Sequence, residues 1–145
     1  MEIRVTADTN ILASGSSHTS TTSAPVQFMK EWEQERFTLV LSEHIFGELD
    51  RTLRQRYYSR RLSAEQRARY LWTLRSKSVI TPLTRTVMGV ASHSEDDLVL
   101  ATAVSGNAKF LVTGDHRLLA LKQYGEVIIV SVHAFLGLLP GLSPG

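Results

Sequence analysis

Apolar runs of strand length alternate along the chain with segments in which apolar residues recur at helical spacing. Strands are predicted at residues 2–7, 37–41, 78–83, 109–113 and 125–132. The second, fourth and fifth of these runs are almost continuously apolar, which is typical of parallel strands that are buried on both faces. The pattern therefore favours a parallel sheet over an antiparallel one.

The segments between the strands carry the periodicity and the start signals of helices. The first predicted helix has Pro25 as its first residue. The second spans residues 43–53 after an N-cap at Ser42, and the third runs from Ser63 to about Lys77. The last two span residues 96–105 and 116–123. Gln66 lies three residues after Ser63, which is the pattern of a capping box. Residues 15–24 are rich in Ser and Thr and are expected to form a loop.

The alternation of strands and helices predicts an α/β fold, a three-layer sandwich in which helices flank a central, mainly parallel sheet. We see no internal repeat and no linker, so residues 1–145 are expected to form one domain. A hydrophobic fraction of 43% is enough for a core. The apolar stretch 127–142 is broken by polar residues and Pro140, and it is shorter than the roughly 20 residues of a membrane-spanning helix. A soluble, cytoplasmic protein without membrane contact is expected.

Residue types that are absent or scattered exclude several classes of site. The chain has no cysteine, which excludes disulfide scaffolds, thiolate metal sites and cysteine nucleophiles. The five histidines do not have the spacing of zinc ligands. No phosphate-binding glycine loop of the P-loop type is present.

Charge is distributed unevenly along the chain. Residues 51–77, which we call the basic arm, contain nine basic residues and one acid, a net charge of +8. The rest of the chain has seven basic and thirteen acidic residues, a net charge of −6. Opposed charges of this kind suit a protein in which one region binds phosphate and another holds a metal ion.

Four carboxylates are spaced so that one edge of the sheet can gather them. Asp8 follows the first strand, Asp115 follows the strand at residues 109–113, and Glu48 and Asp96 lie in predicted helices. Ligands of open α/β folds bind outside the carboxyl ends of the strands. Carboxylates gathered there repel one another unless a cation neutralises them, and a hard divalent metal is the obvious candidate.

Each acid also has a purely structural explanation. Asp8 can form a turn at the end of its strand, Asp96 and Asp97 both suit the start of a helix, and Asp115 can cap the helix that follows it. Glycine at position 114 is expected to allow a tight turn before Asp115.

The helix at residues 43–53 offers three acids. Glu48 borders the apolar face of that helix, Glu43 suits its first turn, and Asp50 is expected to be solvated. Gly47 weakens the helix slightly.

Four segments together resemble the PIN-domain nucleases, and in particular the branch of toxins in toxin–antitoxin pairs. The segments are ADTNIL (7–12), SEHIFGEL (42–49), SEDDLVLATA (94–103) and TGDHRLL (113–119), and the resemblance runs from about residue 3 to about residue 135. It implies a PIN-like fold and a metal-dependent endoribonuclease activity.

The resemblance also implies roles for individual residues. Asp8, Glu48, Asp96 and Asp115 would be catalytic and would hold Mg²⁺ or Mn²⁺, with Asp96 ranked ahead of Asp97. Asn10, Thr113 and Asp97 would support the site. Losing one carboxylate is expected to abolish most activity, and Asp8→Asn is expected to stabilise the metal-free fold by relieving repulsion.

The basic arm combines arginines with aromatic residues, which suits the stacking and phosphate contacts of single-stranded RNA. The alternative is a solvated pair of helices whose aromatic residues belong to the core or to a dimer interface. The aromatic residues are Tyr57, Tyr58, Tyr70 and Trp72, and the expected RNA contacts are Arg51, Arg54, Arg56, Arg60 and Arg61.

Two further hypotheses compete with the nuclease. The chain can be an RNA-binding or RNA-processing module of the same fold with little or no cleavage activity. It can also be a small phosphatase with an aspartyl nucleophile, but those enzymes often have a second Asp two residues later, where this chain has Asn10. The toxin resemblance implies an antitoxin protein as a partner, and a homodimer is expected from the habit of the family.

Overall fold

The computed structural model describes residues 2–16 and 22–142. Residues 17–21 of the predicted Ser/Thr-rich loop, including His18, lie outside these residues. The elements are β1 (Arg4–Ala7), α1 (Thr9–Gly15), α2 (Ala24–Glu33), β2 (Thr38–Leu41), α3 (Glu43–Leu53), α4 (Arg56–Ser59), α5 (Ala64–Lys77), β3 (Val79–Ile80), α6 (Ser94–Ser105), β4 (Phe110–Val112), α7 (His116–Leu121), β5 (Gln123–Tyr124), β6 (Val127–Val130) and α8 (Val132–Leu142).

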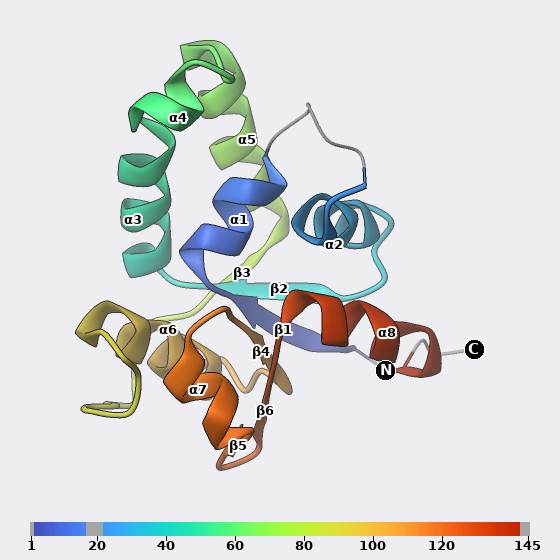
Figure 1. Cartoon of the computed structure of the whole chain (residues 1–145), viewed down its shortest axis with the longest axis vertical. Helices are drawn as coiled ribbons and strands as arrows, with labels where there is room; N and C mark the ends of the chain where they lie inside the picture. The colour runs from blue at the N-terminus through green and yellow to red at the C-terminus, as the bar shows by residue number, and fades with distance from the viewer. Residues whose placement is uncertain (1, 17–21, 143–145) are drawn as a thin grey trace.

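The strands form one sheet in the order β3-β2-β1-β4-β6-β5. All neighbouring pairs are parallel except β5 with β6, which is a short antiparallel pair at one edge. In Figure 1, α1 and α2 lie on one side of the β1–β2 part of the sheet and α6 lies on the other. The predicted α/β sandwich with a mainly parallel sheet is confirmed.

The apolar runs form strands because the sheet is covered on both faces. The side chains of β1, β2 and β4 are almost entirely buried. Four aromatic rings fill the space between the sheet, α2 and α8, with centroids 4.8–5.6 Å apart. These rings belong to Phe28, Phe37, Phe110 and Phe135. Aromatic pairs at such separations add stability beyond the area they bury.

The predicted helix starts are correct in position but differ in chemistry. At α5, Ser63 and Gln66 form the predicted capping box through both reciprocal hydrogen bonds. At α3, Ser42 is the N-cap but its side chain makes no cap hydrogen bond; it bonds Thr102 Oγ1 at 2.8 Å instead, which ties α3 to α6. Pro25 is the second residue of α2, because Ala24 begins the helix after an N-cap at Ser23.

Three of the described helices were not predicted from the sequence: α1, α8 and the four-residue α4 in the basic arm. In α1, Asp8 caps a seven-residue helix whose apolar residues Ile11 and Leu12 are buried. In α8, apolar residues follow β6 with almost no break, and Pro140 lies within the helix. Both segments are too short or too uniformly apolar to show a clear period.

The direction of the chain reverses at the boundary between β1 and β4. From β1 the chain continues through β2 to β3 on one side, and β4, β6 and β5 lie on the other side. In open α/β sheets this topological switch point opens a crevice outside the carboxyl ends of the strands. Within the described residues, no helix is long and apolar enough to cross a bilayer.

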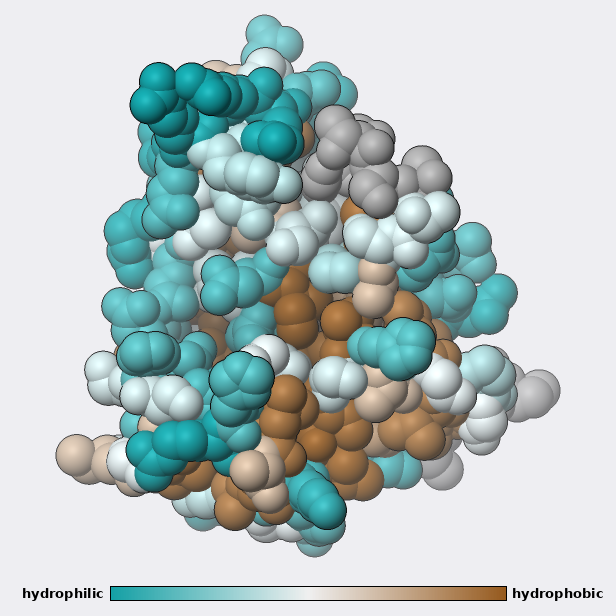
Figure 2. All heavy atoms as spheres, viewed as in Figure 1, coloured by the Kyte–Doolittle hydropathy of each residue, from teal (hydrophilic) through white to brown (hydrophobic). Residues whose placement is uncertain are grey.

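The basic arm forms α4, α5 and the end of α3, and it rises from the sheet as a helical projection (Figure 1). Two hydroxyl groups join it to α1: Tyr70 donates to Leu12 O at 2.6 Å, and Tyr58 lies 3.5 Å from Ser14 Oγ. Figure 2 shows hydrophilic residues over this projection and apolar residues over the centre of the same face.

Candidate functional site

Two adjoining hollows lie at the carboxyl edge of the sheet, at the switch point. The first has a volume of about 380 Å³ and the second about 340 Å³. Four residues line both hollows, namely Asp8, Asn10, His93 and Asp96. Asp115 lines only the first, and Glu48 with Arg51 lines only the second. The fold therefore brings the four predicted acids to one edge, where they share two connected hollows.

Asp8 is held by its backbone and by three hydrogen bonds to its carboxylate. Its Oδ1 accepts from Ile11 N at 3.0 Å, which caps α1, and its Oδ2 accepts from Thr113 Oγ1 at 2.8 Å and from Gly114 N at 3.0 Å. Asp8 N also donates to Val112 O, which continues the pairing of β1 with β4. Asp8 is thus fixed at the base of both hollows.

Thr113 links two of the acids. Its hydroxyl donates to Asp8 and accepts from Asp115 N at 3.0 Å, so the predicted support role matches its geometry. The expected reason for glycine at position 114 is wrong: Gly114 does not have a positive φ, and a Cβ added there would meet nothing within 4 Å. What position 114 contributes is its N–H, which donates to Asp8.

Glu48 projects from α3 into the second hollow. Its Oε2 accepts from Thr9 Oγ1 at 2.9 Å, while its Oε1 is buried without a hydrogen bond, 3.4 Å from His44 Nε2. Burial, the facing Glu95 carboxyl and the charge of Asp96 raise the pKa of Glu48 from 4.5 to about 7, against the hydrogen bond from Thr9. Glu48 therefore exchanges a proton near neutral pH.

Asp96 lies in the first turn of α6 and is half-buried between the two hollows. No described residue donates a hydrogen bond to its carboxylate. Burial, together with the charges of Asp8 and Asp115, raises the pKa of Asp96 from 3.8 to about 6. The carboxylate thus has both oxygens free at the point where the acids crowd one another.

Asp115 caps α7 and closes the first hollow. Its Oδ2 accepts from Leu118 N at 2.9 Å, and its Oδ1 accepts from Ser92 N at 3.2 Å. Burial raises the pKa of Asp115, but these hydrogen bonds and the nearby His93 outweigh it and leave the pKa below its ordinary value. The capping explanation is correct, and the same side chain lines the hollow.

Asp97 lines neither hollow. It is buried, and its carboxylate accepts three backbone hydrogen bonds, from Gly89 N, Val90 N and Ala91 N, at 2.7–3.0 Å. Its contacts are those of a residue that holds the preceding loop in place. The preference for Asp96 over Asp97 agrees with this geometry.

The competing acids of α3 are occupied elsewhere. Glu43 pairs with Arg75, which lowers the pKa of the carboxyl, and Asp50 pairs with Arg54 on the surface of the same helix. Glu95 is exposed, and its carboxyl faces Glu48 in the second hollow.

Three residues of the site were missed by the sequence interpretation. Thr9 orients Glu48, His93 lines both hollows, and Ser92 binds Asp115. A signal existed only for Thr9, which lies between Asp8 and Asn10 in the first motif. His93 and Ser92 lie in a loop whose path depends on Asp97, and the sequence pattern does not show that path.

A family model described as PIN domain matches residues 4–117. The chain belongs to the PIN domain family. A search of curated proteins finds no significant match. PIN domains are generally nucleases of the hydrolase class and typically use divalent metals, so a nuclease-type function follows for this chain.

The donors of this PIN domain fit a hard divalent cation, although they do not form a ready-made cage. Among the described side chains, no group of three or more acids or histidines is arranged to hold a metal ion. The available ligands are nonetheless carboxylate oxygens, which Mg²⁺ prefers, and Mg²⁺ keeps several waters, so few protein ligands suffice. Burial raises the pKa values of Glu48 and Asp96, and the neighbouring carboxyl groups raise them further; a cation would relieve that crowding of negative charge.

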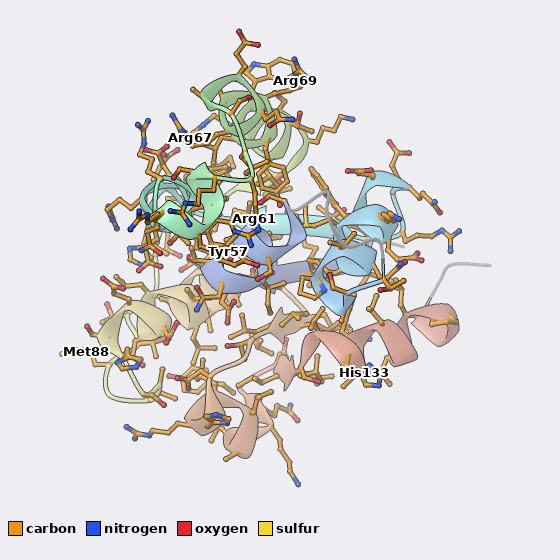
Figure 3. All side chains as sticks on the ribbon, turned by 45° about the horizontal axis from the view of Figure 1, so that its top comes forward. Tyr57, Arg61, Arg67, Arg69, Met88 and His133 are labelled. Atoms are coloured by element: carbon orange, nitrogen blue, oxygen red, sulfur yellow. The ribbon has the colours of Figure 1, made fainter. Side chains whose placement is uncertain are left out.

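The arginines of the basic arm differ in their availability. Arg51 lines the second hollow beside Glu48, and no acid pairs with Arg56 or Arg60 among the described residues. Arg54 is paired with Asp50, and the Arg61 guanidinium lies 3.7 Å from the centroid of the Tyr57 ring. Figure 3 shows Tyr57 and Arg61 together on the face of the arm that looks over α1.

The aromatic residues of the arm divide into two groups. Tyr70 and Tyr58 join the arm to α1, which is a structural role and gives no support to base stacking by these two residues. Tyr57 and Trp72 are exposed by 58% and 68%. They remain the candidates for stacking on bases.

Proposed function

We propose that this PIN domain is a metal-dependent endoribonuclease that hydrolyses single-stranded RNA with Mg²⁺ or Mn²⁺. The observation that carries the proposal is the meeting of Asp8, Glu48, Asp96 and Asp115 in two connected hollows at the switch point, with two of their pKa values raised. Perturbed carboxyl groups in a crevice are a physical mark of a catalytic site.

The surroundings of each side chain indicate whether it would bind the cation or the phosphate. Asp8 and Asp115 are oriented by hydrogen bonds and would hold a cation at fixed positions, while Asp96 has both oxygens free to bind one. When bound, the cation would acidify a water and neutralise charge on the phosphate. Asn10 is exposed at the border of both hollows, where it would orient the phosphate.

Glu48 is the best-placed proton acceptor for the attacking water, because burial raises the pKa of its carboxyl above the ordinary value and its Oε1 accepts no hydrogen bond. The water oxygen would form the new bond to phosphorus while its proton passes to Glu48. The bond from phosphorus to the leaving ester oxygen would break, and that oxygen would take a proton from solvent. No covalent intermediate with the protein is needed.

Arg51 borders the acids, so it would contact the phosphate next to the one that is cleaved. The unpaired arginines of the arm would follow the strand away from the site, with Tyr57 and Trp72 as stacking partners. We also propose that the chain acts as a toxin in the cytoplasm, that an antitoxin protein covers this edge, and that two copies associate. The support is the resemblance of the four segments to that branch of the family.

Asp96→Asn is the sharpest test of the proposed reaction. Its carboxylate bonds to no described residue, so the fold is expected to survive while Mg²⁺-dependent cleavage of a single-stranded RNA falls by about 100-fold or more. Mg²⁺ should raise the melting temperature of the wild type but not of the variant. In cells, wild-type expression should arrest growth and Asp96→Asn should not.

The matched control is Asp50→Asn, because Asp50 lies outside both hollows and, among the described residues, its carboxylate pairs only with Arg54. It should cleave like the wild type. Cleavage by Asp96→Asn at the wild-type rate would refute the mechanism. RNA binding by the wild type without any metal-dependent product would favour the alternative, a PIN-like module that binds RNA without cutting it.

A further inference from the structure

A loop before α6 forms one wall of the first hollow, and two charged side chains hold its backbone, one through N–H groups and the other through carbonyl groups. Asp97 accepts from the N–H groups of Gly89, Val90 and Ala91, as described above. Arg117 of α7 donates to the carbonyl oxygens of Ala91 at 3.2 Å and Gly89 at 3.3 Å. Asp97 therefore holds residues 89–91 through their N–H groups, and Arg117 holds the same segment through two of its carbonyl oxygens. We call Asp97 and Arg117 the clamp.

The held segment leads directly into the site. The next residue, Ser92, donates its N–H to Asp115, and the one after it, His93, lines both hollows. A shift of residues 89–91 would move that N–H away from Asp115. The clamp thus acts on a proposed metal ligand through one backbone hydrogen bond.

We propose that Asp97 and Arg117 are positioning residues, which set the orientation of Asp115 and the place of His93 without touching metal or RNA. The inference rests on the proposed function. Asp97 lines neither hollow, and the three hydrogen bonds that its carboxylate accepts all come from the loop. Partners of metal ligands that act in this way typically change metal affinity or activity by about 10–100-fold when they are lost.

The loop has separate anchors that keep it on the protein without the clamp. Val87 and Ala91 are buried in the core, whereas Met88, between them in the chain, is 82% exposed and points away from the molecule (Figure 3). Clamp variants are therefore expected to fold with a loosened wall. This separates positioning from overall stability.

The experiment uses Asp97→Asn, Arg117→Met and the double variant in the full chain. Each single variant should weaken Mg²⁺ binding, measured by titration calorimetry, by about 10-fold and lower kcat with little change in KM for RNA. The double variant should lose little more Mg²⁺ affinity and kcat than the more strongly affected single variant, because both side chains act through the same three residues. Amide exchange at Ser92 should speed up in all three.

Glu31→Gln and Arg36→Met provide the matched control, since they break a partly exposed acid–arginine pair whose residues line neither hollow. They should leave Mg²⁺ affinity and Ser92 exchange unchanged. A fall in melting temperature with unchanged Mg²⁺ affinity, kcat and Ser92 exchange would show a merely structural role and overturn the proposal.

Failure of the clamp and failure of the proposed function give different results. If the wild type neither binds Mg²⁺ nor cleaves RNA, the nuclease proposal fails and the positioning role fails with it, whatever the exchange shows. If the wild type is active and Ser92 exchange is unchanged in Asp97→Asn, only the clamp is overturned.

Discussion

Asp8 and Asp96 border the same hollows, yet their carboxylates have opposite surroundings. Asp8 accepts three hydrogen bonds, and Asp96 accepts none from the described residues. Asparagine at position 8 would place an amide N–H₂ against a donor, which costs about 1–3 kcal/mol for an unsatisfied buried group. We therefore no longer expect Asp8→Asn to stabilise the metal-free fold. Asp96→Asn is expected to do so instead, because it relieves repulsion without leaving a hydrogen-bond donor unsatisfied.

The raised pKa of Glu48 predicts a pH-dependent stability in the absence of metal. Because its pKa is about 7 in the fold against 4.5 ordinarily, its contribution is fully present below pH 4.5 and is lost as the pH rises through 7. Glu48→Gln should therefore gain stability over the wild type as the pH rises. The hollow is open to water, so we expect a modest gain of about 1 kcal/mol, or roughly 2–4 °C in melting temperature.

Thermal unfolding in chelator at pH 4 and pH 8 measures this effect. The difference in melting temperature between Glu48→Gln and the wild type should be larger at pH 8. Glu43→Gln is a useful comparison, because pairing with Arg75 lowers the pKa of Glu43. Its wild-type contribution is present above the ordinary pKa and is lost in acid, so the trend should reverse. Equal differences at both pH values for Glu48→Gln would contradict the assignment.

The sequence could predict the acids but not their contacts. Asp8, Asp96 and Asp115 stand next to strands or helix starts, where simple rules place them at the carboxyl edge. The roles of Thr9 and Ser92 depend on how α1 and the loop before α6 pack, and packing is a tertiary property. The reason for Gly114 was wrong because an open turn without a positive φ does not require glycine.

At the scale of elements, the apolar pattern predicted the described strands except β5 and most of the described helices, with ends shifted by one to a few residues. The predicted helix at residues 43–53 agrees with α3 at both ends, since Ser42 and the amphipathic pattern mark it clearly. The unpredicted α1 begins directly after β1, where the Asp8 side chain caps it by accepting a hydrogen bond from Ile11 N. The β5–β6 pair is two residues long and left no periodic signal.

Two helix glycines should respond to alanine with opposite signs. At Gly106, which ends α6, a Cβ would collide with Val40 Cγ1 inside the packed core, and overpacking of this kind costs about 1–3 kcal/mol. At Gly47, inside α3, a Cβ would meet only the end of Arg51 at 3.6 Å, and alanine should gain about 0.5–1 kcal/mol from helix propensity.

Denaturant unfolding of Gly106→Ala and Gly47→Ala in the same buffer checks both signs. Gly47 borders Glu48 in sequence, so cleavage should be measured as well, and it should stay at the wild-type level. A stabilised Gly106→Ala protein would show that α6 packs less tightly against β2 than its contacts indicate.

At the scale of the whole molecule, charge and fold coincide. The arm that carries +8 forms a helical projection (Figure 1), and the acids line the two hollows at the carboxyl edge. An RNA strand held by phosphate contacts on the arm would reach the hollows through Arg51, which belongs to both regions. The sequence could predict this division because the basic residues are contiguous in the chain.

The arm predicts a binding affinity that falls with salt. With the Asp96→Asn chain in chelator, binding without cleavage can be followed by fluorescence anisotropy of a labelled single strand. Arg60→Gln should weaken binding a few-fold and reduce the slope of log Kd against log salt by about 0.7–1, as the loss of one phosphate contact does.

Arg75→Gln is the matched control, because Arg75 is already neutralised by Glu43. It should leave the slope unchanged. Equal slopes for Arg60→Gln and Arg75→Gln would place the RNA path somewhere other than α4.

The outermost strands of the sheet, β3 and β5, are only two residues long. Such stubs offer a neighbouring chain almost no row of free amide and carbonyl groups to pair with. If two copies associate as proposed, they would be joined through helical surfaces, and a continuous sheet running through both copies is not expected. The same shortness protects a concentrated solution of the protein against edge-to-edge aggregation.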